Sequence, residues 1–179
     1  MNLNNFLNAE DDGLFYTGHA SFIVRLSGKN YIFDYVDNNK PYGDLWVFFP
    51  ELTKNIPWSK INGVFISHVH QDHYDPVLLK TVDCPIYIIG GRPPFEQVLS
   101  KNSIKFNVIP PNQKFELEAN IFVYGVLHHN NGIDASLYIG NTNFSVYHGN
   151  DNYTDNSTLS NIEKTFGGVH VACVPYAYN

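Results

Sequence analysis

Val64-Phe65-Ile66-Ser67-His68-Val69-His70-Gln71-Asp72-His73 is the stretch of the sequence from which the fold can be predicted. Its first residues are β-branched or aromatic and follow Gly63, a pattern typical of a short buried strand. The polar residues after them predict a loop at the carboxyl end of that strand. This loop places three of the eight histidines of the chain and one aspartate within six positions. Imidazole nitrogen and carboxylate oxygen are ligands for zinc and neighbouring first-row metals, so the stretch predicts a metal site.

The spacing of these side chains predicts how they are used. His68 and His70 are two residues apart, and in extended backbone such residues point the same way, so they can hold one ion together. Asp72 and His73 follow where the chain turns, and they can point at a second position. A surface histidine cluster, or a solvated entry to a helix, is the other interpretation of the pattern. That interpretation gives no reason for a hydrophobic strand to lead directly into the polar residues.

His68-x-His70-x-Asp72-His73 at the end of a strand resembles the signature of the metallo-β-lactamase superfamily of metal-dependent hydrolases. Upstream, Gly18-His-Ala-Ser-Phe-Ile-Val24 and Tyr31-Ile-Phe-Asp34 are similar to the branch that contains L-ascorbate-6-phosphate lactonase-like and N-acylphosphatidylethanolamine phospholipase D-like proteins. The resemblance runs from about Phe15 to the last residue. It implies an α/β protein with the metallo-β-lactamase-like αββα four-layer sandwich, in one domain over residues 1–179.

The resemblance also implies metal ligands outside the central loop. His128-His129 follows Leu127, where the family has its third histidine for the first metal, and we favour His128 over His129. Asp151 resembles the aspartate of the family's Gly-Asp turn, whose carboxylate bridges both metals, although Asn150 is inserted before it. Without a metal, Asp151 is an ordinary turn aspartate. The implied ligands are His68, His70 and His128 for the first metal, Asp72 and His73 for the second, and Asp151 between them.

Three residues near the predicted site have further roles. His19 lies in the upstream segment that resembles the branch, and it is either close to a metal or a structural histidine held by hydrogen bonds. Asp34 is expected to orient the loop beneath the site. Asp72 is expected to orient the nucleophile by accepting its hydrogen bond, in addition to binding the second metal. The resemblance therefore makes Asp72 the predicted catalytic residue.

The remaining chain predicts strands that alternate with helices, followed by hairpins. Residues up to about Gly13 are polar and predict a tail or a loose first strand, whereas residues 37–59 are rich in proline and aromatic residues and predict an ordered loop. The predicted strands are 14–16, 20–26, 31–35, 84–89, 105–109, 115–118, 121–127, 135–140, 144–148 and 169–174. The predicted helices are 76–80, with Asp75 as N-cap, 95–101, and a helix from 156 or 157 to 166.

The predicted strand 169–174 is the last element of this sequence. The resemblance implies a later histidine that completes the second metal site, and none follows. We therefore expect a C-terminally shortened sandwich with an incomplete second site. An exposed apolar edge favours association with other chains, so we expect this edge to be covered by a second copy, by a partner chain or by further residues of a longer product.

The composition argues against several classes of partner. The chain of 179 residues carries a formal net charge of −6 and no run of Lys or Arg, which argues against a nucleic acid or an anionic membrane as the main partner. Neither a signal peptide nor an apolar segment as long as a membrane span is found. Cys84 and Cys173 lie in apolar contexts typical of buried thiols rather than of a disulfide. We therefore expect a single-domain cytoplasmic protein that acts on a small molecule.

These features together predict a zinc-dependent hydrolase that holds one or two ions, with manganese or iron as other candidates. A metal-bound hydroxide would attack a small ester, a lactone or a phosphodiester. Two other functions stay open at this point. One is a non-catalytic metal-binding or interaction module with an incomplete second metal site, and the other is a fragment that another chain completes.

Overall fold

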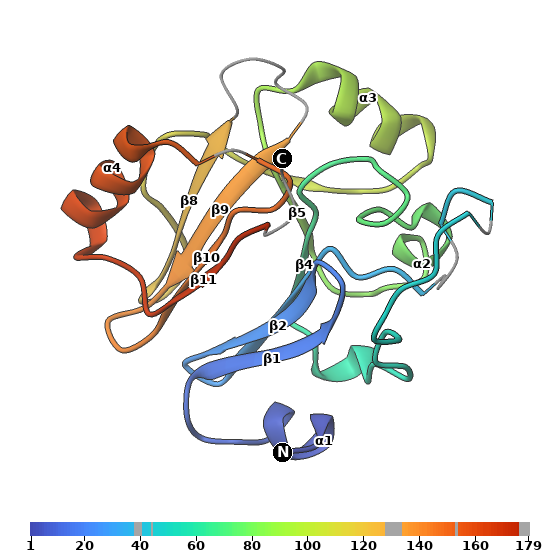
Figure 1. Cartoon of the computed structure of the whole chain (residues 1–179), viewed down its shortest axis with the longest axis horizontal. Coiled ribbons are helices and arrows are strands. Elements are labelled where there is room, and N and C mark those ends of the chain that lie inside the picture. The colour runs from blue at the N-terminus through green and yellow to red at the C-terminus, as the bar shows by residue number, and fades with distance from the viewer. Residues whose placement is uncertain (38–40, 44, 128–133, 153, 176–179) are drawn as a thin grey trace. The chain divides into compact units, whose positions relative to one another are not determined.

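A computed structural model describes residues 1–37, 41–43, 45–127, 134–152 and 154–175 of the chain, whose course is drawn in Figure 1. The chain divides into two compact units. The first consists of Met1–Ile88 and Pro93–Asn107, and the second of Ile89–Arg92 and Val108–Asn179. Two β-sheets and four α-helices form the described regular structure, which confirms the predicted α/β class. One domain over residues 1–179 stays a prediction.

The first sheet brings three distant parts of the sequence to one edge. Its strand order is β1-β2-β3-β4-β5-β6. The strands are β1 (Gly13–Gly18), β2 (Ser21–Leu26), β3 (Lys29–Phe33), β4 (Gly63–Phe65), β5 (Ile86–Ile89) and β6 (Asn107–Ile109). β2 pairs antiparallel with both β1 and β3, whereas β3, β4 and β5 run parallel. The turn from β1 to β2 therefore lies at the same edge as the carboxyl ends of β3 and β4.

Burial and turn chemistry explain the central strands. All six residues of β2 are buried, as expected of a run rich in β-branched and aromatic residues. β2 and β3 are joined by Ser27-Gly28, where both residues have positive φ, 49° and 80°. Two-residue turns of this kind match the twist of paired strands. The predicted strands are confirmed here with small shifts, since β3 begins at Lys29, two residues before the predicted start at Tyr31.

The first residues of the chain form a helix, so the prediction of a tail or a loose strand is wrong. α1 (Leu3–Leu7) has five residues, and the side chain of Asn2 caps it by accepting a hydrogen bond from the backbone N–H of Asn5 at 2.9 Å. Phe6 and Leu7 are buried in the core of the first unit. A helix of this length is too short to show a helical period in the sequence.

Two further helices pack on the same core. α2 (Pro76–Leu79) starts as predicted, because Asp75 accepts hydrogen bonds from the backbone N–H groups of the second and third helical residues, both at 3.0 Å. α3 (Pro93–Lys101) begins two residues earlier than predicted. Leu79 of α2, and Phe95 and Leu99 of α3, are buried with residues of the strands. These contacts fix the chain on either side of β5.

The second sheet has the strand order β11-β10-β9-β8-β7. Its strands are β7 (Phe115–Glu118), β8 (Ile121–Leu127), β9 (Ala135–Gly140), β10 (Ser145–His148) and β11 (Val171–Cys173). β7 to β10 form the predicted antiparallel hairpins, and β11 adds parallel to β10. β11 is shorter than the predicted strand 169–174.

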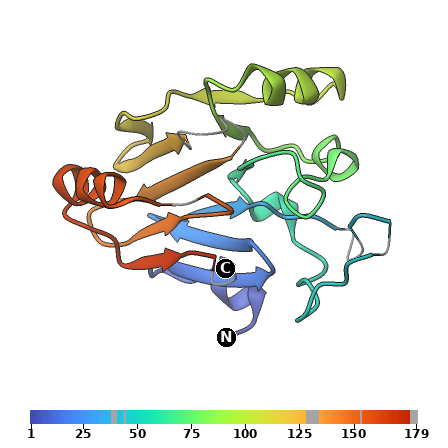
Figure 2. The ribbon, with the colours of Figure 1, turned by 45° about the horizontal axis from the view of Figure 1, so that its top comes forward.

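α4 (Asn156–Phe166) covers this second sheet, as Figure 2 shows. Asp155 caps its start by accepting a hydrogen bond from the backbone N–H of Thr158 at 2.7 Å, and Gly167 ends it with a left-handed φ of 79°. Ile162 packs with Tyr124 and neighbouring tyrosines of the strands. The predicted bounds of this helix are confirmed, and a glycine with a left-handed φ is a common helix end.

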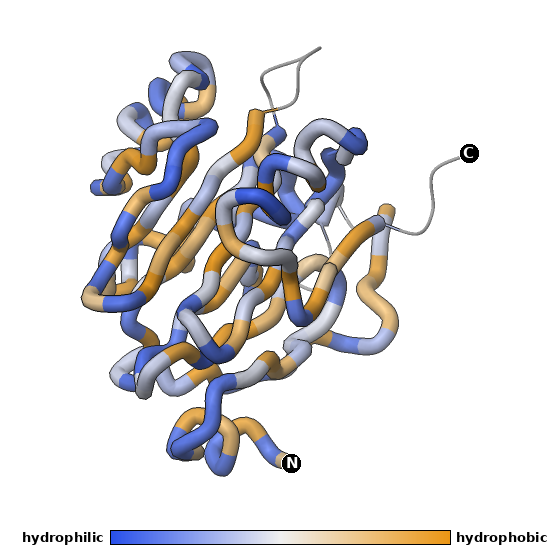
Figure 3. The backbone as a smooth tube through the Cα atoms, turned by 90° about the vertical axis from the view of Figure 1, so that its left-hand side faces the viewer, coloured by the Kyte–Doolittle hydropathy of each residue, from blue (hydrophilic) through white to orange (hydrophobic). Residues whose placement is uncertain are grey.

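The distribution of hydropathy agrees with this architecture, since hydrophobic residues concentrate in the strands and hydrophilic ones in the turns (Figure 3). Cys84 and Cys173 are free and partly buried, and burial raises the pKa of both thiols, as expected of unreactive cysteines. Among the described residues, no helix has both the length and the apolar character that crossing a membrane requires.

Candidate metal centre

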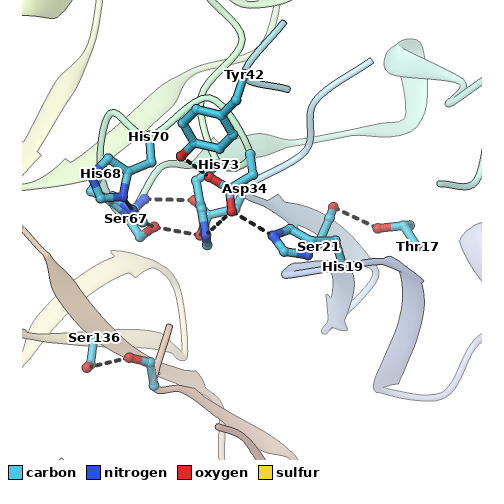
Figure 4. Close-up of polar contacts among 12 residues, drawn as sticks. Thr17, His19, Ser21, Asp34, Tyr42, Ser67, His68, His70, His73 and Ser136 are labelled. Carbon is cyan, nitrogen blue, oxygen red and sulfur yellow. Dashed lines mark hydrogen bonds and ion pairs between the residues drawn. The ribbon is translucent and has the colours of Figure 1, made fainter. Parts of the chain in front are cut away.

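The loop after β4 begins at the buried edge of the first sheet and turns back on itself. The backbone N–H of Ile66 still bonds to the carbonyl of Tyr87 at 3.1 Å, which continues the strand beyond its assigned end. The backbone N–H groups of His73 and Tyr74 then both bond to the carbonyl of His70, at 3.0 and 2.9 Å. This tight turn brings the four predicted ligands of the loop into one small region, where Figure 4 shows polar contacts between side chains.

Asp34, directly after β3, holds this loop, as the sequence predicts. Its carboxylate accepts hydrogen bonds from the backbone N–H of Ser67 at 2.8 Å and from the Ser67 hydroxyl at 2.6 Å. Oδ2 of Asp34, which accepts from the Ser67 hydroxyl, also lies 3.1 Å from Nδ1 of His73. A carboxylate only accepts, so a neutral His73 carries its proton on Nδ1 and presents the lone pair of Nε2. That nitrogen lies 3.5 Å from Oδ2 of Asp72.

His68 and His70 converge as their spacing predicts. Nε2 of His68 lies 2.8 Å from Nδ1 of His70, and Nδ1 of His68 lies 3.0 Å from the Ser67 hydroxyl. His68 is completely buried. Burial, together with the neighbouring His73, lowers the pKa of His68 to about 3. His68 is therefore neutral at physiological pH, which is the form in which imidazole binds metals.

Asp72 is the centre of the polar contacts at this edge. Its Oδ2 lies 2.9 Å from Nε2 of His19, and its Oδ1 accepts a hydrogen bond from the Tyr42 hydroxyl at 2.8 Å. Burial alone would raise the pKa of Asp72, but the hydrogen bond with His19, and the hydrogen bond and charge that His73 provides when both of its nitrogens are protonated, outweigh burial, so this pKa lies well below the usual range. Asp72 is therefore a carboxylate across the whole physiological range, as a metal ligand must be.

His19 lies in the turn between β1 and β2, and the structure brings it into this centre. Its ring stacks on Phe48 at a centroid distance of 4.6 Å and meets the ring of His73 edge-on at 5.5 Å. Of the two roles that the sequence leaves open for His19, the hydrogen bond to Asp72 is observed. That bond places its nitrogen beside a predicted metal ligand.

Tyr42 and Phe48 belong to the centre, although the sequence does not single them out. The backbone N–H of Tyr42 donates to Oε1 of Gln71 at 2.7 Å, so both its backbone and its hydroxyl are fixed against the metal loop. Both aromatic residues come from the predicted loop 37–59, whose described residues form no regular element other than the short 3₁₀ helix Trp58–Lys60. The proline-rich and aromatic composition of this loop was the available signal, and it does not distinguish one aromatic residue from another.

The remaining predicted ligands come from later parts of the sequence. His128 and His129 lie outside the described residues. Asp151 belongs to the second unit, in the turn after β10. The inserted Asn150 takes a positive φ of 55° in this turn, a conformation that asparagine tolerates. The hydroxyl of Ser136 fixes the turn by donating to the carbonyl of Gly149 at 3.0 Å.

The donors of the first unit fit an ion of the zinc type. Two donors that bind one such ion at about 2.0–2.2 Å lie at most about 4.4 Å apart, and the pairs His68–His70 and Asp72–His73 meet this limit at 2.8 and 3.5 Å. In the second pair, Asp34 keeps the proton of a neutral His73 on Nδ1, so Nε2 is a hydrogen-bond acceptor. This nitrogen faces Oδ2 of Asp72, which is also an acceptor. A cation between two acceptors stabilises that arrangement.

Solved structures with the same fold include two described as hydrolases and one described as a hydroxylase. The metallo hydrolase Igni18 from Ignicoccus hospitalis is 19% identical, with a TM-score of 0.65 over 90% of this chain and 69% of its own. A possible metal-dependent hydrolase from Veillonella parvula is 13% identical, with a TM-score of 0.66 over 89% and 70%. The diiron β-hydroxylase CmlA from Streptomyces venezuelae is 17% identical, with a TM-score of 0.63 over 92% and 34%. At these identities the likeness shows the fold alone.

The comparison with curated proteins gives no match. The family model described as the beta-lactamase superfamily domain matches residues 13–176, which include both sheets and the metal loop. Together with the two-sheet α/β architecture, this match confirms the predicted metallo-β-lactamase-like fold class. The chain belongs to the β-lactamase superfamily.

Proposed function

We propose that this protein is a hydrolase that uses zinc, or manganese or iron in its place, to cleave an ester, lactone or phosphodiester bond of a small molecule. The observation that carries the proposal is the convergence of imidazole nitrogens and a carboxylate at one edge of the first sheet, with His68 and His70 at 2.8 Å and His73 and Asp72 at 3.5 Å. When bound, such an ion lowers the pKa of water to roughly 7 and so supplies a nucleophile near neutral pH.

We assign the six ligands implied by the family resemblance to two ions. In this assignment His68 and His70 would share one ion with His128, Asp72 and His73 would hold the other, and Asp151 would bridge the two. The neutral state of His68 and the ionised state of Asp72 support this assignment, because both residues are then in their ligand form at neutral pH. Imidazole with carboxylate suits zinc, iron and manganese, and zinc generally binds most tightly of the three.

The surrounding residues prepare the site for the reaction. Asp34 keeps the proton of His73 on Nδ1. Tyr42 holds Oδ1 of Asp72, so Oδ2 is the oxygen that would bind an ion. Asp72 would also orient a water by accepting its hydrogen bond. Because hydrogen bonds already hold Asp34, Tyr42, Asp72 and His73 in place, these residues need little rearrangement when the substrate reacts.

The substrate that we propose carries an apolar group beside the bond that is cleaved. Leu45, Trp46, Val47 and Phe49 are 83%, 53%, 68% and 97% exposed, and exposed apolar patches mark binding sites. Trp46 meets the ring of Tyr42 edge-on at 5.2 Å, so this segment begins next to the candidate centre. The apolar segment supports a substrate with an acyl chain, as in the phospholipase D-like side of the branch, over a phosphorylated sugar.

The test combines metal analysis with hydrolysis on one preparation. The chain is stripped with a chelator, reloaded with Zn²⁺, Mn²⁺ or Fe²⁺, and offered p-nitrophenyl octanoate, an octanoyl lactone and bis(p-nitrophenyl) phosphate. We expect cleavage of at least one class with metal and none after chelation. His68→Gln should abolish it, whereas His170→Gln, at an exposed histidine of the second unit, should not.

The outcomes separate the proposal from its alternatives. Bound metal without cleavage of any class supports the non-catalytic metal-binding module. Absence of metal binding contradicts the proposal altogether. To test the apolar group of the substrate, kcat/KM of Phe49→Ser is measured with p-nitrophenyl octanoate and with p-nitrophenyl acetate. The variant should have a lower kcat/KM for the octanoate and an unchanged kcat/KM for the acetate. An equal effect on both esters would contradict the assignment of residues 45–49 to substrate binding.

A further inference from the structure

We propose that His19 is the third protein ligand of the second metal position, together with Asp72 and His73. The inference rests on the proposed metal-dependent function and adds a ligand to it. Nε2 of His19 lies 2.9 Å from Oδ2 of Asp72, and the same oxygen lies 3.5 Å from Nε2 of His73. One ligand atom from each of the three residues lies within 4.8 Å of the others. Two imidazoles and one carboxylate form a zinc site that keeps a position open for water.

The local structure holds His19 where a ligand is needed. The strands on either side are tied together by the hydrogen bond from the Thr17 hydroxyl to the Ser21 hydroxyl at 2.7 Å. The carbonyl of Thr17 also accepts from the backbone N–H of Thr53 at 2.7 Å. Gly18 has a φ of 122°, and a Cβ there would lie 3.1 Å from Cα of Leu52. The turn is therefore packed against the chain and projects His19 in one direction.

The backbone of His19 is itself unusual, with a φ of 51°. Residues with a Cβ rarely adopt this left-handed conformation, and where they do, they cluster at functional sites whose surroundings fix them. Phe48 stacks on the flat face of the imidazole, which leaves the ring edge with Nε2 directed at Asp72. Both features favour a precisely oriented nitrogen over a histidine that merely fills space.

The sequence predicts an incomplete second metal site, because no later histidine follows. His19 would supply the histidine that this site lacks. The resemblance places the completing histidine late in the chain, whereas the first sheet brings one from the opposite end of the sequence. β2 runs antiparallel to β3, and β3 runs parallel to β4, so the β1–β2 turn and the metal loop share an edge. The second position thus has three protein donors within the first unit.

The competing explanation is that His19 only orients Asp72 through a hydrogen bond. One nitrogen cannot do both at once, because Nε2 of a neutral imidazole either carries a proton that it donates to Asp72 or presents a lone pair to an ion. His19→Gln separates the two roles. The glutamine amide can donate the hydrogen bond from a similar position, but it is a poor ligand for zinc. His19→Ala removes both functions.

The experiment compares the full chain with His19→Gln and His19→Ala, and with His170→Gln as the control. Each metal-free protein is titrated with Zn²⁺ against a chelating indicator, bound metal is counted by elemental analysis, and visible absorption is recorded with Co²⁺. We expect two ions in the unchanged protein and in the control. Both His19 variants should bind one of the ions more weakly by a factor of about 100 or more, beyond the 10–100-fold typical of a lost partner of a ligand, and should change the Co²⁺ spectrum.

Each other result overturns the inference in a distinct way. If His19→Gln keeps the affinity and the Co²⁺ spectrum while His19→Ala loses them, His19 orients Asp72 and is not a ligand. If both variants match the unchanged protein, with one ion or two, His19 has neither role and the hydrolase proposal stands. If the unchanged protein binds no ion, the proposed function fails as well.

A measurement on the unchanged protein covers the case that a variant does not fold. Histidine-selective ¹⁵N NMR with and without Zn²⁺ reports which ring nitrogens carry protons and which bind the ion. A His19 that is a ligand should show a metal-bound Nε2 and a protonated Nδ1 after zinc is added. A His19 that keeps its proton on Nε2 in the zinc-loaded protein overturns the inference.

Discussion

Asp34→Asn tests how the first sheet prepares the metal loop. The change preserves the size of a side chain that is only 2% exposed. Asp34 has a φ of 43°, and asparagine tolerates that backbone well, so strain does not confuse the comparison. What changes is the number of acceptors, because one carboxylate oxygen becomes an amide group that only donates.

The expected magnitude follows from the three hydrogen bonds of this carboxylate. Oδ1 accepts from the backbone N–H of Ser67, and Oδ2 accepts from the Ser67 hydroxyl and from Nδ1 of His73. Asparagine keeps one acceptor for the backbone, and the hydroxyl can rotate to accept instead. His73 cannot adapt without moving its proton to Nε2, which removes the lone pair from the metal position. Bonds to charged groups contribute about 1.5–3 kcal/mol each, so we expect a loss of about 2–4 kcal/mol in unfolding free energy without metal. We also expect binding of the second ion to weaken about 10–100-fold.

The assay is urea unfolding of the metal-free protein, followed by Zn²⁺ competition. Asp37→Asn is the matched control, because its side chain is 62% exposed and lies 3.7 Å from the ammonium group of Lys54. Such a surface pair contributes at most about 1 kcal/mol, and the control should bind metal normally. An Asp34→Asn protein whose stability and zinc affinity both match those of the control would refute the argument that Asp34 sets the tautomer of His73.

Three further predictions concern neighbouring parts of the centre. Tyr42→Phe removes the 2.8 Å hydrogen bond to Asp72. Because such a bond contributes about 1 kcal/mol, the variant should bind the second ion about 3–10-fold more weakly in Zn²⁺ competition. Unchanged affinity would show that Tyr42 does not hold this carboxylate. The metal-free protein should lose stability as the pH falls from 6.5 toward 3, because the unfolded chain protonates His68 while the folded one, with a pKa of about 3, does not. The slope from this residue reaches about 1.4 kcal/mol per pH unit, and in urea unfolding His68→Gln should have a smaller slope than the unchanged protein. Gly18→Ala forces a side chain onto a φ of 122° and toward Leu52, so it should lower the unfolding free energy by about 1–3 kcal/mol. Gly28→Ala is the control, because the added Cβ meets nothing within 4 Å there. Equal stability of the two variants in urea unfolding would contradict the role of the contact between Gly18 and Leu52.

The sequence predicts those parts of the centre that depend on local spacing. His68 and His70 converge because two residues of one extended segment share a face, and Asp75 caps α2 because the cap and the helix are adjacent. The second unit is predicted well for the same reason, since each of its hairpins joins neighbouring strands. His128 lies outside the described residues, so its assignment as a ligand stays a prediction, as does that of Asp151.

The parts that the sequence does not predict depend on the order of the strands. His19 and Asp72 are 53 residues apart, and their contact exists only because β1 to β4 are neighbours in one sheet. Tyr42 and Phe48 reach the centre from a loop without a regular period, so no pattern marks them. The sequence does not predict the N-terminal helix α1, because five residues are too few to show a helical period. In each case the missing information is tertiary, and neither propensity nor spacing contains it.

Backbone strain marks three residues around the candidate metal centre. Among the described non-glycine residues with positive φ, most are serine or asparagine in turns; the others are His19, Asp34 and Tyr42, at 51°, 43° and 58°. All three contact Asp72 or His73 through a side-chain hydrogen bond. A left-handed backbone costs roughly 1–3 kcal/mol at each such residue, which is a large share of a typical unfolding free energy of about 5–15 kcal/mol. Strain of this size at residues that orient one carboxylate and one imidazole is consistent with the proposed ion between them, because binding an ion would require that orientation.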